Sequence, residues 1–179
     1  MIFSQAYSDM QQQAGRSNNL DGQRSFPAPC MEIYLLTQAQ QKARRKEAGI
    51  FGKLATIFDW QLTRKQRRDY LQALNQGFTL VLTDSSKTVL WASHSFLTMT
   101  GYTTSEAVGQ TTKFLQGEQT SSTELNRINS QLQKRMPVKA DLVNYRKNGE
   151  AYVCRLEIEP LRNSQGEFTH FLAVEMEVV

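Results

Sequence analysis

The sequence predicts an α+β protein in which a five-stranded antiparallel sheet carries short helices on one face and follows a helical extension at the amino terminus. Three observations support this prediction. Apolar residues before residue 77 recur close to the helical period of about 3.6 residues. The short segments after it alternate between apolar and polar residues at the period of two that strands show. These segments also occur in the order of two strands, several short helices and three strands.

The amino-terminal segment lacks a pattern that would build a core. The chain has 179 residues, 40% hydrophobic and 21% charged, which suits one principal domain with extensions. Residues 1–29 are rich in Gln, Ser, Asn and Gly and show no apolar period. Such a segment buries too little apolar surface to fold alone. We expect a flexible tail, or a strap that orders only against a partner.

Residues 30–77 are expected to form a helical extension of two helices. The first begins at Thr37 as its N-cap and reaches residue 58, because its apolar residues repeat at helical spacing. The second covers residues 63–76 and ends at Gly77, which accepts the left-handed conformation that closes a helix. Its first turn, RKQRR, holds four cations where the helix dipole favours anions. A carboxylate partner or a basic binding face is expected to compensate.

Strands and short helices fill the rest of the chain. Apolar runs at residues 78–84 and 87–93, separated by the turn DSSK, predict a β-hairpin. Short helices are expected at residues 95–102, 105–109 and 123–134. Three further strands are expected at residues 138–146, 151–161 and 168–178, joined by turns that contain Asn and Gly.

The charge is concentrated at the amino terminus. Of the net charge of +4, residues 1–77 contribute +5 and residues 78–179 contribute −1. No apolar run is long enough to span a membrane, and no signal peptide is recognisable. We therefore expect a cytoplasmic protein without a membrane association. Basic helix faces are more often solvated than bound to nucleic acid, so we do not expect a nucleic-acid partner.

The sequence offers no catalytic or metal-binding pattern. Cys30 and Cys154 are far apart, and His94 and His170 are the only histidines. This spacing gives no metal site and no thiol redox motif. No nucleophile, base and orienting group occur together in a recognisable motif, so we predict that the protein is not an enzyme. His170, on an outward strand position, is expected at the surface or at an interface.

Four stretches in a fixed order carry a family resemblance: FLTMTGY, GQTTKFLQG, NYRKNGEAY and EPLRNSQGEFTHFLAVEMEV. Together they resemble a PAS domain and, within that superfamily, the light-oxygen-voltage (LOV) branch of flavin photoreceptors. The resemblance covers residues 78–179 and stops before the helical extension. It implies the PAS fold and a ligand pocket between the sheet and its helices.

The resemblance also places individual residues in that pocket. The LOV pattern GRNCRFLQG reads GQTTKFLQG here, so Thr111 stands at the family's asparagine, Thr112 at its photoactive cysteine and Lys113 at its arginine, while Gln116 matches. A threonine hydroxyl cannot replace a thiolate as the nucleophile. We therefore expect no cysteinyl-flavin adduct.

Four more positions complete the candidate cofactor-binding set. Asn144 matches the family's first strand asparagine, and Cys154 replaces the second. Asn129 replaces an arginine that would pair with the flavin phosphate, and Glu175 replaces a glutamine that would bond the flavin ring. An ionised Glu175 opposes flavin binding, because it only accepts hydrogen bonds. The expected cofactor is therefore none or FMN, and Gln116 and Asn144 either contact a ligand or satisfy buried backbone groups.

We predict a sensory or signalling module that acts through dimerisation and its amino-terminal helices. The apolar stripe of the first helix needs a partner surface, so we expect a homodimer through these helices and the sheet face, and a separate signalling partner. Two alternatives stay open. One is an FMN-binding, blue-light-responsive flavoprotein that works by photoreduction, and the other is an adaptor that binds a protein or nucleic acid through its basic helices.

Overall fold

The computed structural model describes residues 28–178 and begins with two helices, α2 (Ala28–Ile57) and α3 (Arg64–Gln76). The chain divides into two units, residues 1–39 and 40–179, and α2 crosses the boundary between them. The predicted tail or strap at residues 1–29 lies outside the described chain, except for its last two residues, which belong to α2.

The first helix starts earlier than its sequence predicts. The prediction of Thr37 as N-cap is wrong, because α2 begins at Ala28 and Thr37 lies inside it, where its Oγ1 donates to the carbonyl of Ile33 at 2.7 Å. Pro29 fits the first turn of a helix, where its missing N–H costs no hydrogen bond. The apolar residues between Pro29 and Thr37 then continue the helix without a break.

The second helix has the predicted ends. The Thr63 hydroxyl accepts the Gln66 N–H at 3.1 Å, and the Gln66 side chain accepts the Thr63 N–H at 3.0 Å, which forms a capping box. Gly77 closes α3 in the left-handed conformation, with φ 84°. The basic first turn has no carboxylate partner from another element among the described residues; its one ion pair joins Arg68 to Asp69.

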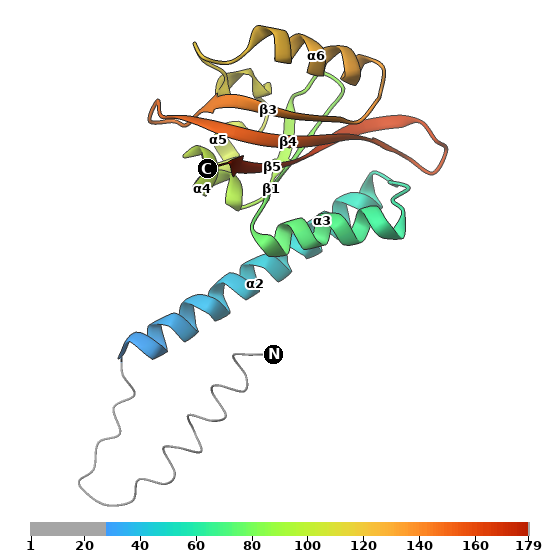
Figure 1. Ribbon diagram of the computed structural model, residues 1–179. Helices are drawn as coiled ribbons and strands as arrows, with labels where there is room; N and C mark the ends of the chain where they lie inside the picture. The colour runs from blue at the N-terminus through green and yellow to red at the C-terminus, as the bar shows by residue number, and fades with distance from the viewer. Residues whose placement is uncertain (1–27, 179) are drawn as a thin grey trace, which may run out of the picture. The chain divides into compact units, whose positions relative to one another are not determined.

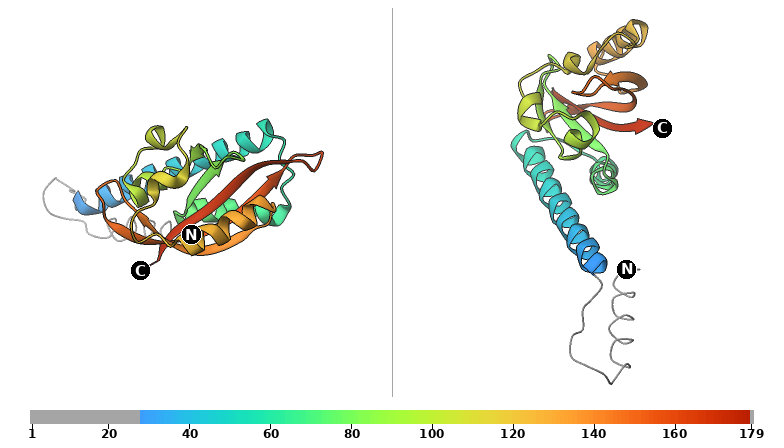
Figure 2. Two further views of the ribbon diagram at one scale, coloured as in Figure 1. Left: turned by 90° about the horizontal axis from the view of Figure 1, so that it is seen from above. Right: turned by 90° about the vertical axis from the view of Figure 1, so that its left-hand side faces the viewer.

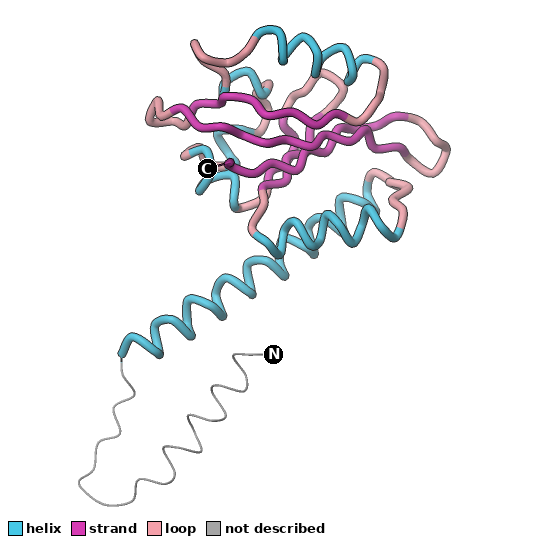
Figure 3. The backbone as a smooth tube through the Cα atoms, viewed as in Figure 1, coloured by secondary structure: helices cyan, strands magenta, loops and turns pink. Residues whose placement is uncertain are grey.

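Five antiparallel strands form one sheet in the order β2-β1-β5-β4-β3 (Figures 1 and 3). The strands are β1 (Thr79–Thr83), β2 (Val89–Ala92), β3 (Val138–Tyr145), β4 (Ala151–Arg162) and β5 (Phe168–Val178). The short helices are α4 (Ser95–Thr100), α5 (Thr104–Ala107), the 3-10 helix η1 (Thr112–Leu115) and α6 (Ser122–Gln133). The predicted fold class and the order of its elements are confirmed.

Helices cover the sheet on both faces (Figure 2). On one face, Val81 of β1 packs with Phe96 of α4 and Leu115 of η1, while α6 packs over β3 and β4. On the other face, Leu80 and Leu82 pack against α3 and the carboxyl-terminal part of α2. All five residues of β1 are consequently buried.

Polar contacts fix the amino-terminal helices to the rest of the unit. The Tyr70 hydroxyl and the Gln66 amide of α3 both donate to the carboxylate of Glu159 on β4. Arg44 of α2 donates to the carbonyl of Asn75 at 2.6 Å, and Glu47 accepts the backbone N–H of His94. Residues 40–77 are thus packed into the same unit as the sheet.

The loop between α2 and α3 binds the β4–β5 hairpin through aromatic side chains. Trp60 Nε1 donates to His170 Nδ1 at 3.3 Å, and Phe58 lies against the same imidazole, with ring centroids 4.1 Å apart. Of the two places expected for His170, the surface or an interface, the surface is wrong, because this loop folds over the side chain and leaves it 9% exposed. Burial lowers the pKa of His170.

The buried ring of Phe51 gives a test of this packing. Phe51 is 1% exposed and contacts the rings of Trp60 and Tyr70 between α2 and the sheet. Phe51→Ala is expected to lower the free energy of unfolding by about 3–5 kcal/mol, measured by urea denaturation. Lys53→Ala, at an exposed position on the same helix, should change it by less than about 0.5 kcal/mol. Equal effects would show that α2 does not contribute to the core.

Candidate functional site

A cavity of about 440 Å³ lies between the inner face of the sheet and the elements η1 and α6. This volume falls within the usual range for small-molecule and cofactor sites. The apolar part of its wall comes from the strands and from both helices; its members are Val81, Leu115, Leu125, Ile128, Leu132, Leu142, Leu156, Ile158, Phe171 and Ala173. The cavity therefore suits a ligand with a largely apolar body.

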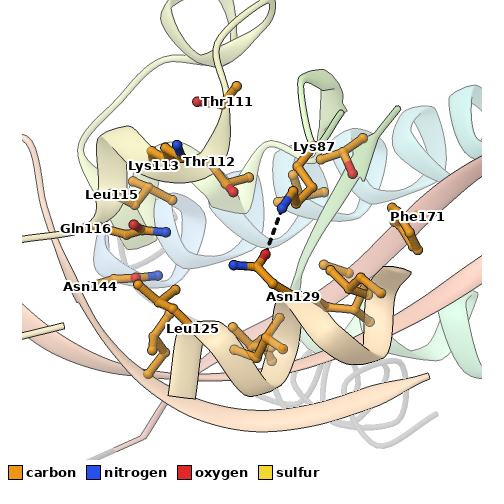
Figure 4. Close-up of a pocket in the computed structure, with 18 of the residues that line it drawn as sticks. Lys87, Thr111, Thr112, Lys113, Leu115, Gln116, Leu125, Asn129, Asn144 and Phe171 are labelled. Carbon is orange, nitrogen blue, oxygen red and sulfur yellow. Dashed lines mark hydrogen bonds between the residues drawn. The ribbon is translucent and has the colours of Figure 1, made fainter. Parts of the chain in front are cut away.

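The motif GQTTKFLQG forms one rim of this cavity. Leu115 is buried, whereas Thr112, Lys113 and Gln116 line the cavity beside it (Figure 4). The Gln116 side chain makes no hydrogen bond to any described residue. An amide with free donors and acceptors at a cavity wall is suited to bind a polar ligand edge.

The glycine that follows holds Gln116 in place. A Cβ atom on Gly117 would overlap the ring of Tyr145 on β3, so only glycine permits this close approach. The Tyr145 hydroxyl accepts the Gln119 N–H at 2.9 Å, and the Thr120 hydroxyl donates to the Val143 carbonyl at 2.6 Å. The loop after Gln116 is therefore attached to the sheet.

The sheet supplies two more polar residues of the cavity. Asn144 lies on β3 and is 5% exposed, and Glu175 lies on β5 and is 8% exposed. Glu175 forms none of the ion pairs found among the described residues, and burial raises the pKa of its carboxyl from 4.5 to about 7. A protonated carboxyl offers one donor and one acceptor, as an amide does.

The structure brings seven of the eight predicted site residues to this one cavity. They are Thr111, Thr112, Lys113, Gln116, Asn129, Asn144 and Glu175. Cys154 does not line it; it is fully buried on β4, with its Sγ 4.0 Å from Glu175 Oε2. Burial, and then the neighbouring Glu175, raise the pKa of this thiol, so it stays protonated. None of the lining residues in the described chain is a cysteine.

The sequence analysis missed one charged residue of the cavity. Lys87, in the turn between β1 and β2, also lines it, and its Nζ donates to Asn129 Oδ1 on α6 at 2.7 Å (Figure 4). The turn DSSK carries no motif that marks its lysine as a cavity residue. The contact depends on α6, which follows Lys87 by about forty residues along the chain.

The cavity residues fit an oxidised flavin. Gln116 and Asn144 provide amides at the wall, the neutral form of Glu175 can replace a third amide, and the apolar wall suits a planar ring. Thr112 adds a hydroxyl to the wall, and a threonine hydroxyl is not a nucleophile that would bond covalently to the ring. Lys87 and Lys113 provide positive charge for an anionic group.

The fold and this cavity define a PAS domain. The family model for the PAS domain matches residues 75–178, and the chain belongs to that family. Among proteins of known function, the chain is 36% identical over 90 residues to the blue-light-activated histidine kinases of Brucella canis and Brucella abortus. The match covers 50% of this chain but only 18% of each kinase. The part that is shared does not assign kinase activity to this chain.

Solved structures of LOV photoreceptors have the same fold. The light-state dimer of the fungal blue-light photoreceptor Vivid is 28% identical, with a TM-score of 0.54 over 56% of this chain and 78% of that one. The light-state LOV domain of the blue-light photoreceptor Aureochrome1 is also 28% identical, with a TM-score of 0.56 over 60% of this chain and 88% of that one. Over its PAS domain the chain is thus related to blue-light photoreceptors.

No group of His, Cys, Asp and Glu side chains among residues 28–178 could hold a metal ion. No helix within the same residues is long and apolar enough to cross a membrane.

The raised pKa of Glu175 predicts a pH-dependent stability. Because the folded protein binds this proton more tightly than the unfolded chain does, wild-type stability should fall as pH rises from about 4.5 through about 7. Glu175→Gln removes this loss, so the variant is expected to exceed wild type in unfolding free energy by about 3 kcal/mol at pH 8, with little difference at pH 4.5. Urea denaturation at both pH values measures the difference. Glu118→Gln, at an exposed position, is the control; a gain for Glu175→Gln that is the same at both pH values would contradict the assignment.

Proposed function

We propose that this chain is a sensory module in which occupancy of the central cavity is transmitted to its amino-terminal helices without a cysteinyl-flavin adduct. The observation that carries the proposal is the composition of the cavity wall. Polar groups suited to a planar ligand are present, while Thr112 stands where the LOV resemblance implies the photoactive cysteine. Since Cys154 does not line the cavity, it does not take the place of that thiol.

Glu175 offers a route from the cavity to the helices. It lines the central cavity and also a second cavity of about 460 Å³ that Arg44 and Glu47 of α2 share with His94 at the start of α4. Glu47 accepts the backbone N–H of His94, so a hydrogen bond joins α2 to the start of α4 between two residues that line this second cavity. A ligand that changes the hydrogen bonds or the protonation state of Glu175 would thereby change how α2 packs beside the second cavity.

FMN, held without a covalent bond, is the ligand that the cavity supports best. The Brucella kinases are named as blue-light-activated, and the similar LOV structures include one solved in a study with a flavin analogue (30% identical, TM-score 0.58 over 62% of this chain and 85% of that one). When bound, the flavin ring would supply the absorption of blue light. Gln116, Asn144 and Glu175 would orient the ring, and the apolar wall would exclude water from it.

The absorption spectrum of the purified chain, before and after addition of FMN, tests this ligand. We expect the structured blue band of bound oxidised flavin. Gln116→Ala should weaken FMN binding about threefold to tenfold, because each neutral hydrogen bond contributes about 0.5–1.5 kcal/mol. Gln119→Ala, in the same loop but outside the cavity, is the matched control. If the spectrum is still flat after incubation with excess FMN and removal of the unbound FMN by gel filtration, flavin is ruled out as the ligand.

We further propose that the module acts as a homodimer through α2 and the outer face of the sheet. In the part of α2 before residue 40, four large apolar side chains are 49–63% exposed: Met31, Ile33, Leu35 and Leu36. A second copy of this helix would bury these residues. The relative Vivid has been solved as a dimer in its light state. On the sheet, α3 covers β1, β5 and the carboxyl-terminal part of β4, so the outer face of β3 and of the amino-terminal part of β4 is the part left for a partner.

A charge on the apolar part of α2 tests this interface. The double variant Ile33→Asp, Leu36→Asp is expected to convert a dimer into a monomer, because two desolvated carboxylates would oppose association. Both residues are more than half exposed in the monomer, so the fold should survive. Gel filtration with light scattering gives the mass. Gln38→Asp is the control, and an unchanged dimer in the double variant would exclude this surface as the interface.

A further inference from the structure

The turn that carries Lys87 holds the residue in a conformation that lysine rarely adopts. Its φ is +66°, in the left-handed region that favours Gly and Asn. The Asp84 carboxylate accepts the N–H groups of Ser86 at 2.8 Å and Thr88 at 2.9 Å, while the Lys87 N–H donates to the Asp84 carbonyl at 3.1 Å. A side chain retained at a strained backbone position points to a functional use.

The Lys87 ammonium lies at the wall of the central cavity and points toward Asn129 (Figure 4). Its Nζ donates to Asn129 Oδ1 at 2.7 Å, and Lys87 takes part in none of the ion pairs found among the described residues. An ammonium has three N–H donors, so two stay available after this hydrogen bond. The cation is therefore fixed in position but not neutralised by a carboxylate.

Strand register separates this cation from Glu175, the one carboxyl group among the described residues that line the cavity. Glu175 pairs with Thr79 at the beginning of β1, and Lys87 follows the end of β1 at Thr83. Four residue steps along a strand correspond to about 13 Å. The backbone positions of Lys87 and Glu175 thus lie toward opposite ends of the stretch of β1 that borders the cavity, with apolar wall residues between them, and burial raises the pKa of the Glu175 carboxyl to about 7, so that it is only partly ionised near neutral pH.

We propose that Lys87, positioned by Asn129, binds the anionic end of the ligand in the central cavity, and that this anion is a phosphate monoester. The inference rests on the proposed function, because it concerns the same cavity. Lysine binds phosphate as a point charge and needs no forked geometry. Ser86 and Lys113 also line the cavity and add a hydroxyl and a second ammonium. Lys87, from the β1–β2 hairpin, thus supplies positive charge beside Asn129. The LOV resemblance implies an arginine at the position of Asn129.

The assignment makes Lys87 a specificity-determining residue. Riboflavin and FMN share the ring that Gln116 and Asn144 would contact, but only FMN carries a phosphate. Removal of Lys87 should therefore weaken FMN and leave riboflavin unchanged. Loss of Gln116 should weaken both ligands to the same extent.

Titration of the full chain with FMN and with riboflavin, followed by flavin fluorescence, measures this difference. Wild type is expected to prefer FMN, and Lys87→Gly should reduce that preference about tenfold to a hundredfold. Because glycine accepts the left-handed conformation, Lys87→Gly should keep or raise the melting temperature, so lost binding cannot be due to unfolding. Lys87→Arg should retain the preference, and so should Lys65→Gln, which removes an exposed charge on α3. An unchanged ratio in Lys87→Gly would overturn the assignment.

Phenyl phosphate tests whether Lys87 binds a phosphate monoester even if the ligand is not a flavin. If wild type binds neither flavin, the flavin proposal fails, and phenyl phosphate then tests Lys87 alone. Millimolar phenyl phosphate should raise the melting temperature of wild type and of Lys65→Gln, but not that of Lys87→Gly. An equal rise in all three proteins, or a rise in none, would show that Lys87 does not bind a phosphate monoester.

Discussion

The structure depends on the burial of β1 on both of its faces. Leu80 and Leu82 pack against the amino-terminal helices, whereas Val81 packs against the helices around the cavity. Since successive residues of a strand point to opposite faces, one strand separates the two layers. The amino-terminal helices and the ligand cavity consequently lie on opposite faces of the same strand, so a shift of β1 on one face also moves the other.

Burial also decides the chemistry of the cavity. Glu175 is an acidic residue by sequence, but its isolation from solvent and cations raises the pKa of its carboxyl to about 7, so near neutral pH much of it is protonated. Its neighbour Cys154 stays a thiol for the same reason. Burial thus lets Glu175 offer the cavity a neutral hydrogen-bonding group, which suits a planar heteroaromatic ligand, and it keeps Cys154, which does not line the cavity, unreactive.

Much of the fold and part of the site could be predicted from local patterns. The strand alternation at residues 151–161 and the cap residues Thr63 and Gly77 all act within a few residues, and each occurs as predicted. Gln116 and Asn144 follow from motifs read in order along the chain. The start of α2 was missed because Thr37 resembles a cap, although nothing interrupts the helix before it.

The sequence by itself determined the α+β class and the order of the strands along the chain, because periodicity and turn chemistry are local properties. It also determined the polar residues that family motifs mark. Only the tertiary structure decided that α3 covers the second face of the sheet, that His170 is buried beneath Trp60, and that Lys87 reaches Asn129. The contacts of His170 and Lys87 join residues that are 110 and 42 positions apart. They depend on packing, which brings such residues together and sets the solvation that fixes their charge.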